Sequence, residues 1–385
     1  MKYNISKTVK DLPPSGIRAF FDLVLEMKDV ISLGVGEPDF VTPWHIREKA
    51  IDVLEQGYTS YTSNKGMPEL RQQISRFLKH RHGLAYNFKD QILIAVGVSE
   101  AIDLAFRAIL NPGDRVLIPQ PSYVSYGPTV IMAGGVPVYL KTSLSNGFKL
   151  TPAQIERAAD SKTRVLLLNY PCNPTGASYC KRELQQIARI VKKKNLLVVT
   201  DEVYDELTYD FEHTPLATLP GMKERVVMLN GVSKAYAMTG FRLGWACGPA
   251  EIIAAMTKIH QYTMLCAPIM AQMAAREALR NGSRSVAEMK REYIRRRRFI
   301  VEELNRIGLP CHMPQGAFYV FPSIAKTGQT GLAFAKNLLK QQKVALVPGS
   351  AFGPDYDGHV RISYATGYDD LKEAVQRIAV YLEHK

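Results

Sequence analysis

The sequence predicts an α/β fold with a large, doubly wound, mostly parallel sheet and a smaller α/β domain beside it. Its 385 residues exceed the usual length of one domain, and 46% of them are hydrophobic, enough for a sizeable core. Between residues 91 and 200, short apolar runs alternate with amphipathic stretches. Strands separated by helices imply right-handed crossovers and a sheet that is buried on both faces.

The elements of the large domain follow from these patterns, from the N-terminal side onward. A helical pattern ends at Leu54, and further helices are expected at Glu69–His82, Ser99–Leu110, Tyr123–Ala133 and Arg182–Lys194. Strands are expected at Gln91–Val96, Val116–Ile118, Val136–Leu140, Arg164–Asn169, Leu196–Thr200 and Arg225–Leu229, with another short apolar run at Gly244–Cys247.

The chain after Ala250 leads away from this sheet. Two helical stretches, one to about Leu279 and one at Val286–Asn305, precede a second group of elements. In that group we expect strands at Ala317–Phe321, Val344–Val347 and His359–Ser363, and helices at Leu332–Gln341 and Leu371–Leu382. We therefore predict a large cofactor-binding domain at 46–285 and a small domain at 1–45 plus 286–385.

Composition limits the classes of function. The net charge of +13 invites a nucleic-acid hypothesis, but the densest basic run, Arg295–Arg298, has glutamates around it and is interpreted as a solvated helix face. The five cysteines lack metal-like spacing, which indicates reduced thiols and no metal site. The start of the chain lacks the apolar core of a signal peptide, and no run is long enough to span a bilayer. We expect a cytoplasmic protein that binds neither nucleic acid nor membrane.

Lys234 lies in a turn between two apolar runs, next to Ser233 and a short way before Arg242. A lysine held in an apolar setting loses solvation of its ammonium, so its pKa falls and its amine becomes available for a Schiff base. Arg242 could hold a phosphate or carboxylate with its planar fork of donors. The alternative is a solvated turn lysine and a surface arginine.

Gly97, Val98 and Ser99 join a predicted strand to a helix start. Ser99 is a suitable N-cap, and the free amides of a helix start form a cradle for phosphate. A plain helix cap would use the same residues. The segment lacks the Gly-x-Gly-x-x-Gly fingerprint, which argues against a nicotinamide enzyme.

The Ser-Lys pair followed by Met238–Gly244 resembles the cofactor-lysine signature of the class I aminotransferases, which are fold type I, pyridoxal-phosphate-dependent enzymes related to aspartate and aromatic aminotransferases. The resemblance runs through nearly the whole chain. It implies that Lys234 carries pyridoxal 5′-phosphate as a Schiff base and that Gly97, Val98, Ser99 and Arg242 hold the cofactor phosphate, beside Ser233. It also implies a homodimer that exchanges amino groups between amino acids and 2-oxo acids by a ping-pong mechanism.

The resemblance also assigns residues in four other motifs. The glycine at position 34, in the loop Val30–Phe40, matches the one whose amide contacts the substrate carboxylate. Tyr61 matches a tyrosine that crosses the dimer interface to the cofactor phosphate, and Tyr123 matches the aromatic that stacks on the pyridine ring. Asn173, in an Asn-Pro-Thr-Gly turn, matches the residue that bonds the phenolic oxygen and the substrate carboxylate. Without the resemblance, a connector, a loop aromatic, core packing and a tight turn remain open for these residues.

Two charged residues complete the expected site. Asp201 ends a strand and, by resemblance, pairs with the protonated pyridine nitrogen, while Tyr204 bonds the phenolic oxygen; a helix cap and simple packing are the alternatives. Glu202 is expected to face solvent or to support its neighbours. Arg361 matches the arginine that grips the substrate α-carboxylate, although an edge-strand charge would look the same.

The preferred amino donor is expected to be aromatic, and 2-oxoglutarate is expected to be the acceptor. In the family, one subgroup of aspartate enzymes has a lysine where this chain has Ser99. By resemblance, Gln261–Cys266 matches the partner-subunit segment near the substrate side chain, and it contains no arginine. Aspartate and N-acetyl-diaminopimelate aminotransferases, and a β-lyase, remain alternatives. A transcription regulator is disfavoured because the segment before Gly34 is too short for a helix-turn-helix module.

Overall fold

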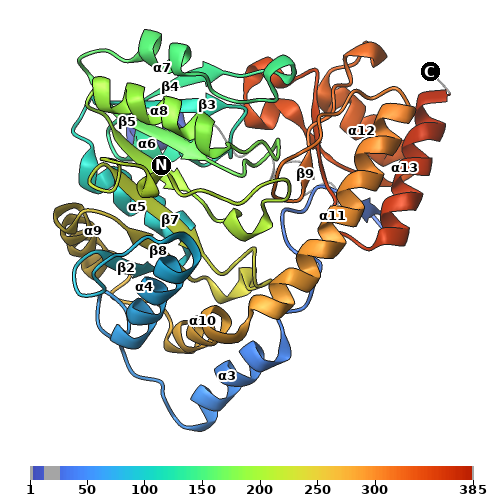
Figure 1. Ribbon diagram of the computed structural model, residues 1–385. Coiled ribbons are helices and arrows are strands. Elements are labelled where there is room, and N and C mark those ends of the chain that lie inside the picture. The colour runs from blue at the N-terminus through green and yellow to red at the C-terminus, as the bar shows by residue number, and fades with distance from the viewer. Residues whose placement is uncertain (1–2, 13–26, 384–385) are drawn as a thin grey trace.

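The computed structural model describes residues 3–12 and 27–383. The remaining parts of the predicted small domain, residues 1–2, 13–26 and 384–385, lie outside the described residues. Figure 1 shows a large sheet-containing region, with a smaller region of helices and short strands beside it and the long helix α11 running between them.

The large sheet has seven strands in the order β2-β8-β7-β6-β5-β3-β4. Their bounds are β2 Ile92–Ala95, β3 Arg115–Gln120, β4 Val136–Lys141, β5 Thr163–Asn169, β6 Leu197–Asp201, β7 Val226–Gly231 and β8 Gly244–Cys247. The pairs from β4 to β7 are parallel, while β8 runs antiparallel to both β7 and β2. The predicted doubly wound, mostly parallel sheet is therefore confirmed.

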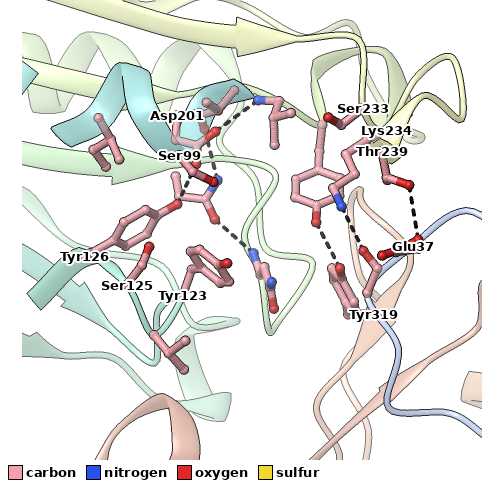
Figure 2. Close-up of a pocket in the computed structure, with 18 of the residues that line it drawn as sticks. Glu37, Ser99, Tyr123, Ser125, Tyr126, Asp201, Ser233, Lys234, Thr239 and Tyr319 are labelled. Carbon is pink, nitrogen blue, oxygen red and sulfur yellow. Dashed lines mark hydrogen bonds between the residues drawn. The ribbon is translucent and has the colours of Figure 1, made fainter. Parts of the chain in front are cut away.

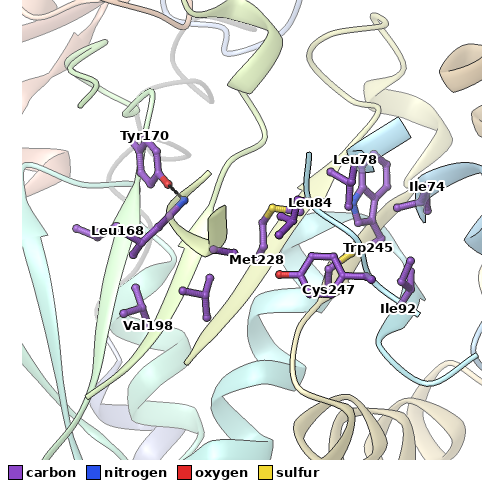
Figure 3. Packing of buried hydrophobic residues seen from close by; sticks show 14 of the residues in the cluster. Ile74, Leu78, Leu84, Ile92, Leu168, Tyr170, Val198, Met228, Trp245 and Cys247 are labelled. Carbon is purple, nitrogen blue, oxygen red and sulfur yellow. Dashed lines mark hydrogen bonds between the residues drawn. The ribbon is translucent and has the colours of Figure 1, made fainter. Parts of the chain in front are cut away.

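Alternate strand residues point to opposite sides of this sheet, and hydrophobic clusters pack on both of its faces. Ile94, Leu166 and Trp245 belong to the hydrophobic cluster on one face, part of which is drawn in Figure 3. Their neighbours Leu93, Leu167 and Ala246 belong to the cluster on the other face. The covering helices are α3 Trp44–Glu55, α4 Pro68–His82, α5 Gly97–Ile109, α6 Tyr126–Met132, α7 Pro152–Ala158, α8 Lys181–Lys193, α9 Ala250–Thr263 and α10 Ile269–Asn281.

The smaller region has its own core. Its strands β9 Tyr319–Val320, β11 Val347–Pro348 and β12 Val360–Ser363 form an antiparallel sheet, and β1 Ile31–Ser32 pairs in parallel with β10 Val344–Ala345. The short helix α1 Lys7–Asp11 has no buried residue and lies against α6 of the large region. The helices of the smaller region are α11 Ser283–Arg306, α12 Gly331–Gln342 and α13 Tyr368–Glu383. A hydrophobic cluster joins these elements, so the segment around β1 packs with the C-terminal part of the chain.

Several predicted elements need correction. The helical stretch predicted to run to Leu279 is two helices, α9 and α10, because Leu265 has a positive φ and Pro268 cannot continue a helix. The strand predicted at Val344–Val347 is divided between β10 and β11, which pair with different partners. The helix predicted from Tyr123 begins only at Tyr126.

The basic run on α11 was interpreted wrongly for two of its four arginines. Arg296 and Arg297 are buried, whereas Arg295 and Arg298 are exposed. Each buried guanidinium forms an ion pair with an aspartate outside the helix, Asp39 for Arg296 and Asp210 for Arg297. Periodicity places Arg296 and Arg297 on the buried face of α11. It could not identify Asp39 and Asp210 as their partners, because both come from distant segments.

Candidate active site

A cavity of about 720 Å³ lies at the carboxyl ends of β5 and β6, the edge at which open parallel sheets bind ligands. Asn169 and Asp201, the last residues of these strands, are direct partners in the strand register and both line the cavity. Figure 2 shows Asp201, Ser99 and Tyr126 on one side of this space and Lys234, Glu37 and Tyr319 on the other.

Most of the predicted site residues line this one cavity. They are Gly34, Val98, Ser99, Tyr123, Asn173, Asp201, Tyr204, Ser233, Lys234, Arg242 and Arg361. Gly97 precedes the lining residue Val98 but is not itself part of the lining, and neither is Tyr61, which is 84% exposed on this chain.

Lys234 follows β7, and its side chain is directed across the cavity. Its Nζ donates to the carbonyl oxygen of Gly36 at 2.8 Å and lies 6.0 Å from the centre of the Tyr204 ring. Burial lowers the pKa of Lys234 to about 8, since the ammonium loses its hydration, and the nearby Glu37 carboxylate opposes part of that change. Lys234 therefore has an unusually accessible neutral amine.

Asp201 is a buried carboxylate held by two donors. The Tyr126 hydroxyl donates to its Oδ2 at 2.7 Å, and the Val203 amide donates to its Oδ1 at 3.2 Å. Burial raises the pKa of Asp201, while these two hydrogen bonds and the charge of Lys234 oppose the rise. A carboxylate of this kind is suited to pair with a cationic ring nitrogen. Sequence reasoning missed Tyr126, because nothing in the sequence says that the start of α6 faces β6.

The start of α5 forms the expected cradle of free backbone amides, but its N-cap residue differs from the predicted one. The helix begins at Gly97 and Val96 is its N-cap residue, so the prediction of Ser99 as N-cap is wrong; Ser99 lies in the first turn. Gly97 has φ +75°, a conformation that residues with a side chain rarely adopt, and a Cβ there would lie 2.8 Å from Nη2 of Arg242. The free amides of this turn and the Arg242 guanidinium thus converge on one end of the cavity, a fitting place for a phosphate.

Arg361 projects from β12 and is fully enclosed. Its Nη1 donates to Oδ1 of Asn173 at 2.9 Å, and its Nη2 donates to the carbonyl oxygen of Gly34 at 2.5 Å. The guanidinium lies 4.6 Å from the centre of the Tyr319 ring, and its Nε has no hydrogen-bond partner among the described residues. A buried guanidinium with spare donors in a cavity is ready to bind an anion.

Other lining residues carry contacts that the sequence did not reveal. Tyr204 shares a 2.9 Å hydrogen bond with Tyr319, and Thr239 donates to a carboxylate oxygen of Glu37 at 3.1 Å. Asn169 donates from its amide to the Asp201 carbonyl oxygen at 3.0 Å. The sequence did contain a signal for Glu37 as a lining residue, because Glu37 directly follows Gly36 in the loop that was predicted to contact the substrate.

Glu202 does not face solvent, as one of the two expectations for it had proposed. Its carboxylate is buried and accepts hydrogen bonds from Thr200 at 2.7 Å and Tyr170 at 3.2 Å, and it lies 2.7 Å from Nε2 of His213. This network supports the strand end that carries Asp201. Alternation along β6 explains the difference, since residues 201 and 202 point to opposite faces.

The sequence model of the family described as "Aminotransferase class I and II" matches residues 28–378. The chain belongs to this family. It is a pyridoxal-phosphate-dependent aminotransferase of fold type I, as its resemblance predicted. Among residues 3–12 and 27–383, no helix is both long and apolar enough to cross a membrane, and no three metal-binding side chains are grouped.

Similar proteins carry several substrate names. The provisionally named aminotransferase YugH of Bacillus subtilis is 54% identical over 99% of this chain and 98% of its own length. The aspartate aminotransferase of Pyrococcus abyssi is 45% identical over 97% of this chain and 96% of its own. The crystal structure of the aromatic aminotransferase from Pyrococcus horikoshii is 44% identical, with a TM-score of 0.91 over 96% of this chain and 99% of that one.

The residues present fit pyridoxal phosphate. One end of the cavity has the α5 amides and Arg242 for its phosphate, and the other wall has the buried Asp201 carboxylate for its ring nitrogen. Lys234 supplies an amine of lowered pKa between them. The cation and amides suit the phosphate of the cofactor, the carboxylate suits its ring nitrogen, and the amine suits its aldehyde carbon.

Proposed function

We propose that this aminotransferase takes its amino group from an aromatic amino acid and passes it to 2-oxoglutarate in two successive half-reactions. The observation that carries the proposal is that each cationic side chain lining the cavity is assigned to the cofactor or to the substrate α-carboxylate. Arg242 faces the phosphate cradle, Lys234 provides the reactive amine, and Arg361 is available for the α-carboxylate. In the described chain no lining cation is left for a distal carboxylate.

The chemistry centres on Lys234. Bound pyridoxal phosphate supplies an electrophilic carbon for the amino group and a ring that accepts the electron pair released at the substrate α-carbon. With its pKa lowered to about 8, the Lys234 amine takes the α-proton as a neutral base and returns it as an ammonium. Asp201, which accepts from Tyr126 and Val203, keeps a negative charge where a protonated ring nitrogen would lie.

Arg361, Asn173 and Gly34 are proposed to hold the substrate carboxylate. The Asn173 Oδ1 is engaged by Arg361 at 2.9 Å, which fixes the amide so that its NH₂ group is left as a donor. The contact from Arg361 to the Gly34 carbonyl fixes the plane of the guanidinium. A planar, pre-oriented fork binds a carboxylate by two parallel hydrogen bonds and orients the α-carbon toward Lys234.

Aromatic residues around the cavity support an aromatic donor. Tyr123, Tyr204 and Tyr319 line it together with apolar side chains, which makes its walls largely aromatic and apolar. The Glu37 carboxylate would repel the distal carboxylate of aspartate. The names of relatives divide between both substrates, since the protein from Thermococcus litoralis that is 42% identical is called an aromatic-amino-acid aminotransferase. 2-Oxoglutarate still has to enter, so the pocket must adapt to one distal carboxylate.

A second copy of the chain is proposed to complete the site. Tyr61 is 84% exposed and Tyr262 is 86% exposed, and Trp44 and Met264 add further exposed apolar surface. Such a surface is typical of a protein interface. In the dimer we infer that Tyr61 reaches the cofactor phosphate of the partner. We also propose the division into domains at 46–285 and at 1–45 plus 286–385, and a cytoplasmic location, which the free cysteines support.

The test is a panel of donors with 2-oxoglutarate as acceptor. Phenylalanine, tyrosine, aspartate and an N-acetylated diamino acid are compared by kcat/KM, and release of pyruvate from cysteine is measured alongside to detect β-elimination. We expect phenylalanine or tyrosine to exceed aspartate. A preference of about tenfold for aspartate or the acylated diamino acid, equal to ~1.4 kcal/mol in transition-state binding, would overturn the proposal.

A further inference from the structure

A segment of extended chain, residues 34–42, passes from β1 to α3 and lies over the cavity; it is called the strap here. Gly34, Gly36 and Glu37 of the strap line the cavity. Among the described residues, none of the strap's backbone groups forms a hydrogen bond with another backbone group. Side-chain contacts must therefore hold the strap in place.

One of these contacts is an ion pair with α11. Nη1 of Arg296 lies 2.8 Å from each carboxylate oxygen of Asp39, and its Nε donates to Glu292 at 3.0 Å. The guanidinium also lies 5.3 Å from the centre of the Phe40 ring. Only 6% of the Arg296 side chain is exposed, so this ion pair is shielded from solvent and is less weakened by salt than a surface pair.

The next residue provides a natural comparison. Arg297 is as buried as Arg296 and lies on the same helix, but its guanidinium bonds Asp210 and the carbonyl oxygen of Pro314. Its guanidinium forms no hydrogen bond or ion pair with residues 34–42. The two adjacent arginines thus have equal burial and similar ion pairs but different targets.

We propose that Arg296 is a positioning residue for substrate binding, acting through Asp39 and the strap. Asp39 lies five residues after Gly34, whose carbonyl oxygen accepts from Arg361, and three residues after Gly36, whose carbonyl oxygen accepts from Lys234. Anchoring at Asp39 therefore fixes the carbonyl groups that orient Arg361 and close the cavity over the amine. This role rests on the proposed carboxylate site at Arg361.

The expected effect is specific to the substrate. The phosphate cradle and Asp201 are positioned by α5, β6 and Tyr126, and among the described residues none of these forms a hydrogen bond or ion pair with Asp39 or Arg296. Loss of the Arg296–Asp39 pair should therefore weaken amino-acid binding while the affinity for the cofactor stays nearly constant. A purely structural role would lower stability without separating these two affinities.

The experiment compares holoenzyme variants Arg296→Ala, Arg296→Lys, Asp39→Asn and the double variant with Arg297→Ala as the matched control. Binding of 3-phenylpropionate, an unreactive carboxylate, is followed by the cofactor absorbance, and hydrogen exchange of residues 34–42 is measured by mass spectrometry. We expect Arg296→Ala to raise the donor KM and the Kd of 3-phenylpropionate about tenfold with a much smaller change in kcat, and to speed exchange in the strap. Arg296→Lys, a point charge in place of a fork, should lie between.

The double variant should resemble either single variant, because both remove one interaction. The proposal is overturned if Arg296→Ala keeps the parent KM, if Arg297→Ala raises the KM equally, or if the effects of Asp39→Asn and Arg296→Ala simply add. Should Arg296→Ala not fold, Arg296→Lys and Asp39→Asn give the same readouts. If an Arg361→Lys variant kept the parent affinity for amino acids, the assignment of Arg361 as the carboxylate site would be wrong, whatever the hydrogen exchange of the strap shows.

Discussion

The lowered pKa of Lys234 predicts how fast the apoenzyme takes up its cofactor at different pH values. Lowering the pKa from its usual 10.5 to about 8 disfavours the ammonium by about 3 kcal/mol. At pH 7 the neutral fraction is then about 10%, against about 0.03% for an ordinary lysine, a difference of ~300-fold in reactive amine. Because only the neutral amine attacks, the rate should rise with pH and level off above about pH 8.

The assay mixes apoenzyme with pyridoxal phosphate and follows the absorbance of the covalent adduct between pH 6.5 and 10.5. Glu37→Gln provides a test of sign: the Glu37 carboxylate raises the pKa of Lys234, so its removal should move the midpoint to lower pH. A rate that keeps rising tenfold per pH unit up to pH 10 would refute the reasoning. So would a midpoint that moves upward in Glu37→Gln.

Three further substitutions test the remaining parts of the site. Arg361→Lys loses one arm of a bidentate carboxylate pair, about 1.5–3 kcal/mol, and kcat/KM should fall by that amount for every amino-acid donor; unchanged values would exclude the assigned role. Tyr126→Phe removes the hydroxyl donor to Asp201, so the carboxyl pKa rises and the acidic limb of the kcat profile should move to higher pH; an unmoved limb would contradict the Tyr126 contact. Gly97→Ala places a Cβ at φ +75° and 2.8 Å from Nη2 of Arg242, at a cost of about 1–2 kcal/mol, and should raise the Kd of pyridoxal phosphate about tenfold; parent affinity would argue against the cradle.

Much of the fold and the site could be predicted from local pattern. The buried strands are short runs of Val, Leu and Ile, and their carboxyl ends carry the polar residues that meet at one edge, as Asn169 and Asp201 do. Lys234 and Arg361 stand in motifs whose order is shared by a family, and both line the cavity.

Contacts between distant segments were the part that could not be predicted. Tyr126 meets Asp201 across 75 residues, and Arg296 meets Asp39 across 257. Helical periodicity places Arg296 on the same face of α11 as Tyr293 and Ile300, and the exposed Arg298 off that face. Periodicity gives the direction of a side chain, but it does not identify the segment that the side chain will face. For the same reason Glu202 was not recognised as the centre of a buried network.

Borohydride reduction of the holoenzyme tests the central claim most directly, because reduction makes the link between cofactor and protein permanent. Peptide mass spectrometry then identifies the modified lysine. The account predicts the cofactor mass on the peptide that contains Lys234, and no reducible adduct in Lys234→Ala. Attachment to any other lysine, or a reducible adduct that persists in Lys234→Ala, would contradict it.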